Sequence, residues 1–484
     1  MPRRSTPEPP NISAVRQGNF GEPAARKKWN QGSVAGNPLH AVSSSPERAN
    51  RHRNRSIYAQ ALVLFNVLGI SLSSASRLEH DFTSVFPTKS LTSLAVVIGL
   101  QIFILLASPL PVGHLYNALA NRQHGYRSSS WGWKMLFGVA IVVATTSEFL
   151  NYTVQKNYIA ILLLRGLVLG GALGTCFTIS TLVLASHYRN DVPLVSVQSG
   201  FAAFAGAVVY TVIARFAFQD AGLGGANSGG GLAYVYSGGV MGATLLSAFL
   251  LLVGLKPEDE ELWTQRYKLH VCMPKGFFED ARGGGMWFIL GYILVFAGVL
   301  VYPVFNVVLL TQVPGLFFPD AAAYAILGML GVAAVSGSVM ANLRRLKKVG
   351  AVNIFVAASI LAGVICLAPV LYPRLYVVVL LAGAYGVALG AVLSLHMIVA
   401  AMFLSKKVEG RWEDDMPARV AIIMALAGLG AFGGIVGAAA LLEGNKNGEK
   451  VVIKVAGACM IGGGVLIGFA RMWRWRWKAA FYAV

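Results

Sequence analysis

Long apolar segments, separated by short polar stretches, fill the sequence from residue 57 onward. An α-helix needs about 20 mainly apolar residues to cross a hydrocarbon core of ~30 Å, and most of these segments have that length. The pattern therefore predicts an all-α polytopic membrane protein with about twelve transmembrane helices. They are expected at 57–76, 91–118, 132–151, 158–186, 192–216, 232–254, 286–312, 320–341, 350–371, 375–403, 418–442 and 451–471.

A longer polar segment, residues 255–285, falls between the sixth and seventh apolar segments. It divides the predicted helices into two six-helix bundles, 57–254 and 286–471. Residues 1–56 are rich in Pro, Ser, Asn and Arg and poor in aliphatic residues, which predicts a disordered basic tail. Residues 472–484 form a second short tail.

Basic residues are distributed unequally between the two faces of this arrangement. Of 40 Lys and Arg residues, 31 lie in the two tails and the loops of one face, eight lie in the opposite loops, and Arg165 lies inside an apolar segment. Cytoplasmic loops of membrane proteins are enriched in Lys and Arg. We therefore expect the 255–285 linker and both tails to be cytoplasmic. This enrichment of basic residues on the cytoplasmic side of the lipid bilayer accounts for the net charge of +19, so no nucleic-acid partner is expected.

Composition narrows the chemistry further. Only 13% of the 484 residues are charged, about half the share of a soluble domain. The four cysteines show no paired spacing, so neither a disulfide nor a metal site is expected. His, Cys, Asp and Glu form no cluster with catalytic spacing. The sequence thus predicts a protein that is not an enzyme and needs no cofactor.

A weak internal repeat follows the second and eighth apolar segments. In each copy a glycine is followed four or five residues later by an asparagine and then by basic residues. The first copy holds Gly113, Asn117 and Arg122, and the second holds Gly337, Asn342 and Arg344. Equivalent motifs in two six-helix halves are typical of transporters that arose by duplication.

Twelve spans with these repeated motifs resemble the major facilitator superfamily. Within it, residues 80–215 resemble the fungal monocarboxylate-transporter-like permeases. The matching stretches are Phe82–Leu91, Arg165–Gly174, Ser186–Asn190 and Val197–Gly200. The resemblance implies secondary transport by alternating access between two bundles. Asn117 stands where the superfamily usually has Asp, and the eighth span lacks the Asp–Arg pair of animal monocarboxylate carriers.

Arg165 is the leading candidate for a functional residue. A charged side chain inside a membrane is costly unless it faces a cavity or a partner, and Arg suits a carboxylate because it donates two parallel hydrogen bonds. The alternative is a structural Arg bonded to backbone carbonyls or to Glu148. Glu148 itself either exchanges a proton, pairs with Arg165, or forms a solvated helix end.

The further candidates are a histidine and four uncharged polar residues within the apolar segments. His396 lies deep in an apolar segment and either titrates or packs as a hydrogen-bonded core residue. Four polar residues are placed to line a central cavity: Asn66, Gln101, Tyr302 and Asn306. Pro303 is expected to break the seventh span near its middle, because proline lacks the N–H of a helix interior.

The predicted function is secondary active transport of a small organic molecule, with a carboxylate or other organic anion as the expected class. Proton coupling is one option for the driving force. Nutrient uptake and efflux of a metabolite both remain open, and a monomer is expected. The plasma membrane is the first expectation, with a vacuolar or peroxisomal membrane as the alternative. A transport-inactive receptor or scaffold with the same fold is the competing function.

Overall fold

A computed structural model describes residues 46–121, 131–187, 199–219, 229–255, 284–312, 319–342, 349–371, 375–404, 407–408, 411–412, 416–445 and 447–474. Nearly all of this part of the chain is helical. Eleven helices in it are long and apolar enough to cross a membrane, and a shorter apolar helix covers Tyr324–Met340. The predicted class, an all-α polytopic membrane protein, is confirmed.

Several helices of the first half are joined end to end and together make single spans. In chain order, the elements are α1 (Pro46–Leu72), α2 (Ser74–His80), η2 (Asp81–Val85), α3 (Leu91–Ala107), α4 (Pro109–Asn121), α5 (Trp131–Val154), α6 (Tyr158–Ile161), η3 (Leu162–Leu169), α7 (Gly170–His187), α9 (Gly200–Gln219) and α10 (Gly229–Val253). The elements η2 and η3 are π-helical.

The second half has the same alternation of long helices. Its elements are α13 (Met286–Val299), α14 (Val301–Gln312), α15 (Pro319–Asn342), α17 (Ala351–Leu371), α18 (Leu375–Leu404), α19 (Met416–Gly444) and α20 (Gly448–Arg474). Between α18 and α19, β1 (Lys407–Val408) pairs antiparallel with β2 (Arg411–Trp412). We call the end at which the chain enters α1 the entry end, and the opposite end, where α3 and α20 begin, the far end.

The first span is longer than the sequence pattern predicted. The prediction ended it at residue 76, whereas the helical segment continues over Arg51–Val85. No Gly or Pro lies between Gly69 and Pro87 to stop the helix, so it carries Arg77 and Asp81 onward instead of releasing them into a loop. This correction moves three charged residues, Arg77, Glu79 and Asp81, from a predicted loop into a helix.

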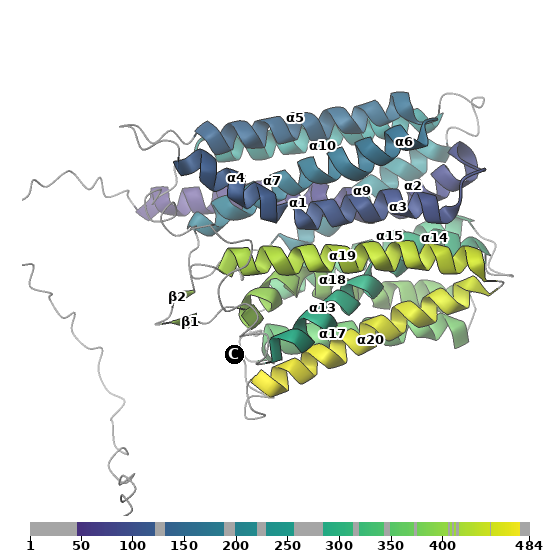
Figure 1. The fold of residues 1–484 in the computed structure, drawn as a ribbon. Helices are drawn as coiled ribbons and strands as arrows, with labels where there is room; N and C mark the ends of the chain where they lie inside the picture. Colours follow the sequence, from purple (N-terminus) through teal and green to yellow (C-terminus); the bar gives the residue numbers. More distant parts are fainter. Residues whose placement is uncertain are drawn as a thin grey trace, which may run out of the picture. The chain divides into compact units, whose positions relative to one another are not determined.

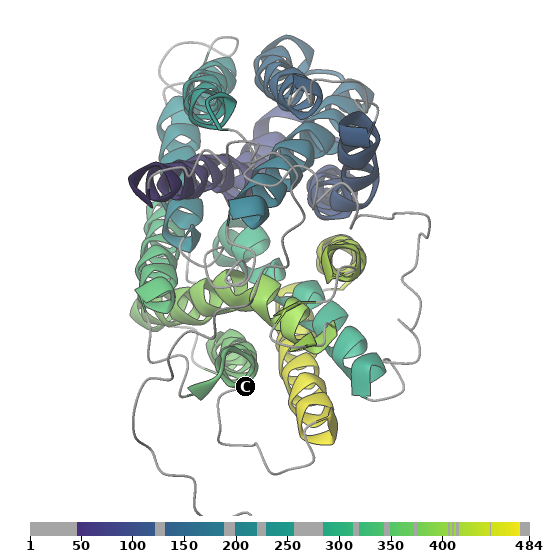
Figure 2. The ribbon, with the colours of Figure 1, turned by 90° about the vertical axis from the view of Figure 1, so that its left-hand side faces the viewer.

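Helices up to α10 form one group and those from α13 onward form a second, as the colours show in two views (Figures 1 and 2). The groups contact each other most extensively where α3 packs along α19 and α9 packs along α15, and α2 also packs against α14. Glycines make close crossings within each group. A Cβ atom at Gly170 would lie 2.8 Å from the Gln101 carbonyl oxygen, and one at Gly434 would lie 2.0 Å from that of Ala297.

Pro303 breaks the seventh span as predicted. The α13 helix ends at Val299 and α14 begins at Val301. In an unbroken helix the carbonyl of Val299 would accept from the N–H of residue 303, which proline lacks. The Tyr385 hydroxyl fills that place, donating to the Val299 carbonyl oxygen at 2.8 Å. The break therefore has a specific partner on α18.

The repeated glycines lie inside helices, Gly113 in α4 and Gly337 in α15. Asn117 and Asn342 belong to the same helices, and nothing is described of their side chains. Arg122 and Arg344 lie outside the described residues, as do residues 1–45 of the basic tail, most of the 255–285 linker and residues 475–484.

Candidate functional site

Four charged side chains are buried together in the first half of the chain. Arg77 and Asp81 come from the first span, Glu148 from α5 and Arg165 from η3. Their exposed fractions are 2%, 6%, 0% and 2%, respectively. Since a buried charge in a membrane is costly unless it is paired, the pairing of these four decides what the site can do.

Arg77 and Glu148 form the better satisfied of two ion pairs. Arg77 Nη2 lies 2.8 Å from Glu148 Oε1, and the same oxygen accepts a hydrogen bond from Ser237 Oγ at 2.6 Å. Asn151 Nδ2 donates to the other carboxylate oxygen at 3.4 Å. The Arg77 guanidinium also lies over the Tyr234 ring, 5.6 Å from its centroid. Both oxygens of the Glu148 carboxylate are thus occupied, while Arg77 Nη1 is buried without a hydrogen-bond partner among the described residues.

Arg165 and Asp81 form a sparser pair. Arg165 Nη1 donates to Asp81 Oδ2 at 3.0 Å. In the described part of the chain, Asp81 Oδ1 and Arg165 Nε are buried without a hydrogen-bond partner. Both residues sit in π-helical segments, which are rare and frequently occur at functional sites. This pair therefore has hydrogen-bonding capacity left for a proton, a water or a ligand.

Tyr234 on α10 lies within electrostatic range of all four charged residues, so the two pairs share one neighbourhood. Arg165 also interacts electrostatically with Glu148. Two arginines and two carboxylates balance, so the cluster has no formal net charge when all four are ionised. Addition of one proton leaves it with a charge of +1.

The structure corrects two predictions about this site. Glu148 is fully buried and not a solvated helix end. The direct partner of Arg165 is Asp81, not Glu148 or a backbone carbonyl. Sequence reasoning missed Asp81 and Arg77 because it ended the first span at residue 76. Their spacing of four residues, within the stretch 70–86 that holds no Gly or Pro, was the available signal.

The neutral candidates divide into satisfied and unsatisfied groups. Asn66 is hydrogen-bonded at both amide atoms within the first half. Tyr210 Oη donates to Asn66 Oδ1 at 2.5 Å. Asn66 Nδ2 donates to the Leu62 carbonyl at 2.7 Å and to Thr244 Oγ1 at 2.9 Å. These bonds join α1, α9 and α10. Asn66 therefore acts as a packing residue in this structure.

Gln101, Tyr302 and Asn306 keep unused hydrogen-bonding atoms. Gln101 Nε2, Tyr302 Oη and both amide atoms of Asn306 are buried with no partner among the described residues. Buried polar groups in proteins are nearly always bonded, so each such atom marks a place for a water or a ligand. Tyr302 and Asn306 are four residues apart on α14 and hence lie on one helix face.

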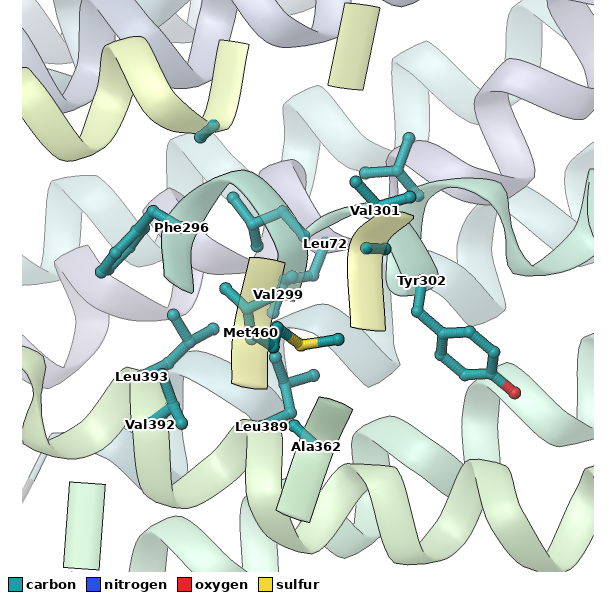
Figure 3. Close-up of a cluster of buried hydrophobic side chains, with 14 of the residues drawn as sticks. Leu72, Phe296, Val299, Val301, Tyr302, Ala362, Leu389, Val392, Leu393 and Met460 are labelled. Carbon is teal, nitrogen blue, oxygen red and sulfur yellow. The ribbon is translucent and has the colours of Figure 1, made fainter. Parts of the chain in front are cut away.

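Tyr302 belongs to the buried apolar cluster of the second half, but its hydroxyl lies at the edge of that cluster. Its hydroxyl points away from the cluster that includes Phe296, Leu393 and Met460 (Figure 3). Its ring packs against that of Tyr385 at 4.7 Å between centroids. The break in the seventh span thus places one tyrosine hydroxyl on a backbone carbonyl and leaves the neighbouring hydroxyl available.

His396 lies in an aromatic environment in the second half. Its Nδ1 is 2.6 Å from the Leu393 carbonyl oxygen, and its ring meets that of Phe296 edge-on at 6.0 Å. Tyr292 Oη donates to the His396 carbonyl at 3.2 Å. These contacts are those of the packing alternative, and they hold His396 in one orientation.

Comparison with solved structures identifies the fold. The chain is similar to the nucleoside transporter NupG, with a TM-score of 0.56, 16% identity and coverage of 88% of this chain and 99% of that one. It is similar to the major facilitator superfamily proton:xylose symporter XylE, with a TM-score of 0.56, 11% identity and coverage of 89% and 96%.

The structure of a D-xylose–proton symporter aligns with a TM-score of 0.63 at 12% identity, covering 86% of this chain and 96% of that one. No family model and no curated protein sequence matches this chain. The described helices and these alignments define a multi-pass membrane protein with the major facilitator fold. At these identities the likeness concerns the fold alone.

Proposed function

We propose that this protein is a proton-coupled secondary transporter that carries a small organic molecule by alternating access between its two halves. The observation that supports the proposal best is the Asp81–Arg165 pair. It is buried, it lies in two π-helical segments, and each partner keeps an unused hydrogen-bonding atom. Buried acids of this kind mark proton pathways in transporters.

Charge balance supplies the coupling in this proposal. With Asp81 ionised, Arg165 is neutralised and has little attraction for an anion. With Asp81 protonated, the cluster gains a positive charge, and Arg165 can bind a carboxylate through two parallel hydrogen bonds. Proton and anion then bind together and cross without net charge movement. Two of the proteins with a similar fold are proton symporters, which is compatible with this scheme.

A carboxylate is the substrate class that we propose. The resemblance of residues 80–215 to fungal monocarboxylate-transporter-like permeases supports it, and Arg165 lies within the resembling part. Tyr302, Asn306 and Gln101 would bind a neutral polar group of the same molecule, since their side chains carry unused donors and acceptors. Those groups also suit the hydroxyls of a sugar or a nucleoside, so the test includes both classes.

The proposal extends to the setting of the protein. We propose that the protein is a monomer in the plasma membrane. Both chain ends are proposed to be cytoplasmic, because the basic residues gather on one face. The two six-helix units, 57–254 and 286–471, would be the bodies that rock against each other. Uptake and efflux use the same coupled step in opposite directions.

Uptake by proteoliposomes tests the proposal. Purified protein is reconstituted, and the initial uptake of radiolabelled lactate, pyruvate, xylose and uridine is measured with and without an inward proton gradient. We expect uptake of a carboxylate that the gradient accelerates, and loss of that uptake in Arg165→Ala. Arg165→Lys keeps the charge but loses the planar fork, so partial activity is expected.

Three outcomes revise the proposal differently. Uptake of xylose or uridine in place of the acids would retain the transporter and replace the substrate class. Unchanged transport in both Arg165 variants would remove Arg165 from the mechanism. Correctly folded protein that carries no compound of the panel would favour the receptor or scaffold function.

A further inference from the structure

Glu443, in the last turn of α19, reaches across to the first turn of α3 in the other half. Its carboxylate accepts hydrogen bonds from the backbone N–H of Leu91, from Thr92 N at 3.3 Å and from Thr92 Oγ1 at 2.5 Å. The partners are more than 350 residues apart in the chain. This contact joins the two halves at the far end.

The start of α3 explains why a carboxylate fits there. The first N–H groups of a helix have no partner within the helix, and they carry a partial positive charge. Ser90 caps α3 by accepting from Ser93 N at 3.1 Å. This cap leaves the amides of Leu91 and Thr92 in need of another acceptor. Glu443 accepts from both of them. The N-terminus of α3 is thus completed by a residue of the opposite half.

Exposure makes this contact reversible. Glu443 is exposed to solvent, and Thr92 is partly exposed. Water can replace each of the three hydrogen bonds when the halves separate, so opening leaves no buried donor without a partner. A fully buried contact of the same composition would resist opening far more strongly.

The contact at the entry end has a different physical basis. There α9 and α15 cross at Gly200 and Gly337, with Ser394 of α18 against both. A Cβ at Gly200 would lie 2.5 Å from Ser394 Oγ, and one at Gly337 would lie 3.0 Å from it. Ser394 Oγ has no hydrogen-bond partner among the described residues. Close packing therefore joins the halves at this end, whereas at the far end the Glu443 contact adds to the packing of α2 against α14 and of α3 against α19.

We infer that Glu443 is a reversible clasp that holds the far end of the transporter closed. The contact forms when the first turn of α3 meets α19, and it breaks when the far end opens. This inference rests on the proposed function, because a clasp matters only if the two halves move. Without the carboxylate, the far end should spend more time open.

Distance measurements between the halves test the clasp without any substrate. Spin labels are placed at Thr88→Cys and Asn447→Cys, both exposed at the far end, in a background lacking the native cysteines. Double electron–electron resonance then gives the distance distribution in lipid nanodiscs. Glu443→Ala should raise the ratio of long to short distances about tenfold, the size expected from losing several modest hydrogen bonds.

Matched variants separate the clasp from a general loss of structure. Glu449→Ala removes an acid from the first turn of α20 at the same end and should leave the distribution unchanged. Glu443→Gln keeps an acceptor without the charge and should give an intermediate distribution. The thermal unfolding midpoint of each variant, measured in parallel, shows whether it remains folded.

An unchanged distribution in folded Glu443→Ala would overturn the clasp, and so would an equal shift in Glu449→Ala. The two proposals fail separately. Far-end opening without uptake of any compound leaves the clasp in place and removes the transporter. Uptake by the wild type, together with an unchanged distance distribution in Glu443→Ala, would keep the transporter and remove the clasp.

Discussion

Each of the two buried ion pairs of the first half joins an arginine to a carboxylate, but the surroundings of the two pairs differ. Glu148 accepts from Arg77, Ser237 and Asn151, and both members of the pair lie on regular α-helices. Among the described residues the Asp81 carboxylate accepts from Arg165 alone, and both members lie in π-helical segments. A carboxylate with both oxygens engaged resists a proton, whereas one with a free oxygen has room for it.

This difference assigns separate roles to the pairs. Arg77–Glu148 ties the first span to α5 and α10 and stabilises the bundle. In our proposal Arg165–Asp81 is the pair that changes during transport. The same contrast recurs in the second half, where Tyr385 donates to the freed carbonyl of Val299 and Tyr302 donates to no described residue.

The largest effect is expected from breaking the satisfied pair. Glu148→Gln leaves the Arg77 charge buried without a counter-charge, which costs about 3–5 kcal/mol. The free energy of unfolding, from denaturant titration in detergent micelles, should fall by that amount. A change below about 1 kcal/mol would mean that Glu148 does not stabilise the bundle.

Breaking the sparser pair should cost less. Asp81→Asn removes one charge-assisted hydrogen bond, worth about 1.5–3 kcal/mol, and Arg165 keeps its electrostatic interaction with Glu148. The same titration should therefore rank Asp81→Asn above Glu148→Gln in stability. Equal losses in the two variants would erase the distinction between the pairs.

Tyr385→Phe extends the comparison to the second half. The variant removes the donor to the Val299 carbonyl and leaves that buried oxygen without its partner, a cost of about 1–2 kcal/mol. Thermal unfolding of the purified variant should show a clear decrease in midpoint. An unchanged midpoint would show that the break at Pro303 does not depend on α18.

Tyr302→Phe should have the smallest effect on stability. Its hydroxyl has no partner among the described residues, so its removal should change the free energy of unfolding by less than about 0.5 kcal/mol. In the uptake assay the same variant should reduce transport, because the hydroxyl is proposed to bind substrate. A stability loss equal to that of Tyr385→Phe would place the hydroxyl in the core network.

Much of the fold followed from the apolar periodicity of the sequence. Segment length indicated the spans, and Pro303 located the break in the seventh span, because both effects are local. The end of the first span was wrong, since charged residues normally stop an apolar segment. Arg77 and Asp81 continue the helix only because residues on α5 and η3 neutralise them.

The pairing within the site was beyond the reach of the sequence. Arg165 and Glu148 were recognised as unusual by their position, but their partners depend on how distant spans pack. The partners of Glu443 could not be predicted for the same reason. They are mainly backbone amides at the start of α3, and every residue type except proline has such an amide. Only three-dimensional packing separates the satisfied Asn66 from the unsatisfied Asn306.

The most direct test of the central claim compares proton-driven uptake with exchange in proteoliposomes. For a compound that the wild type carries, Asp81→Asn should keep exchange of labelled for unlabelled substrate and lose acceleration by an inward proton gradient. Ser237→Ala, which alters only the satisfied pair, should keep both. If Asp81→Asn responds to the gradient as the wild type does, Asp81–Arg165 is not the coupling pair.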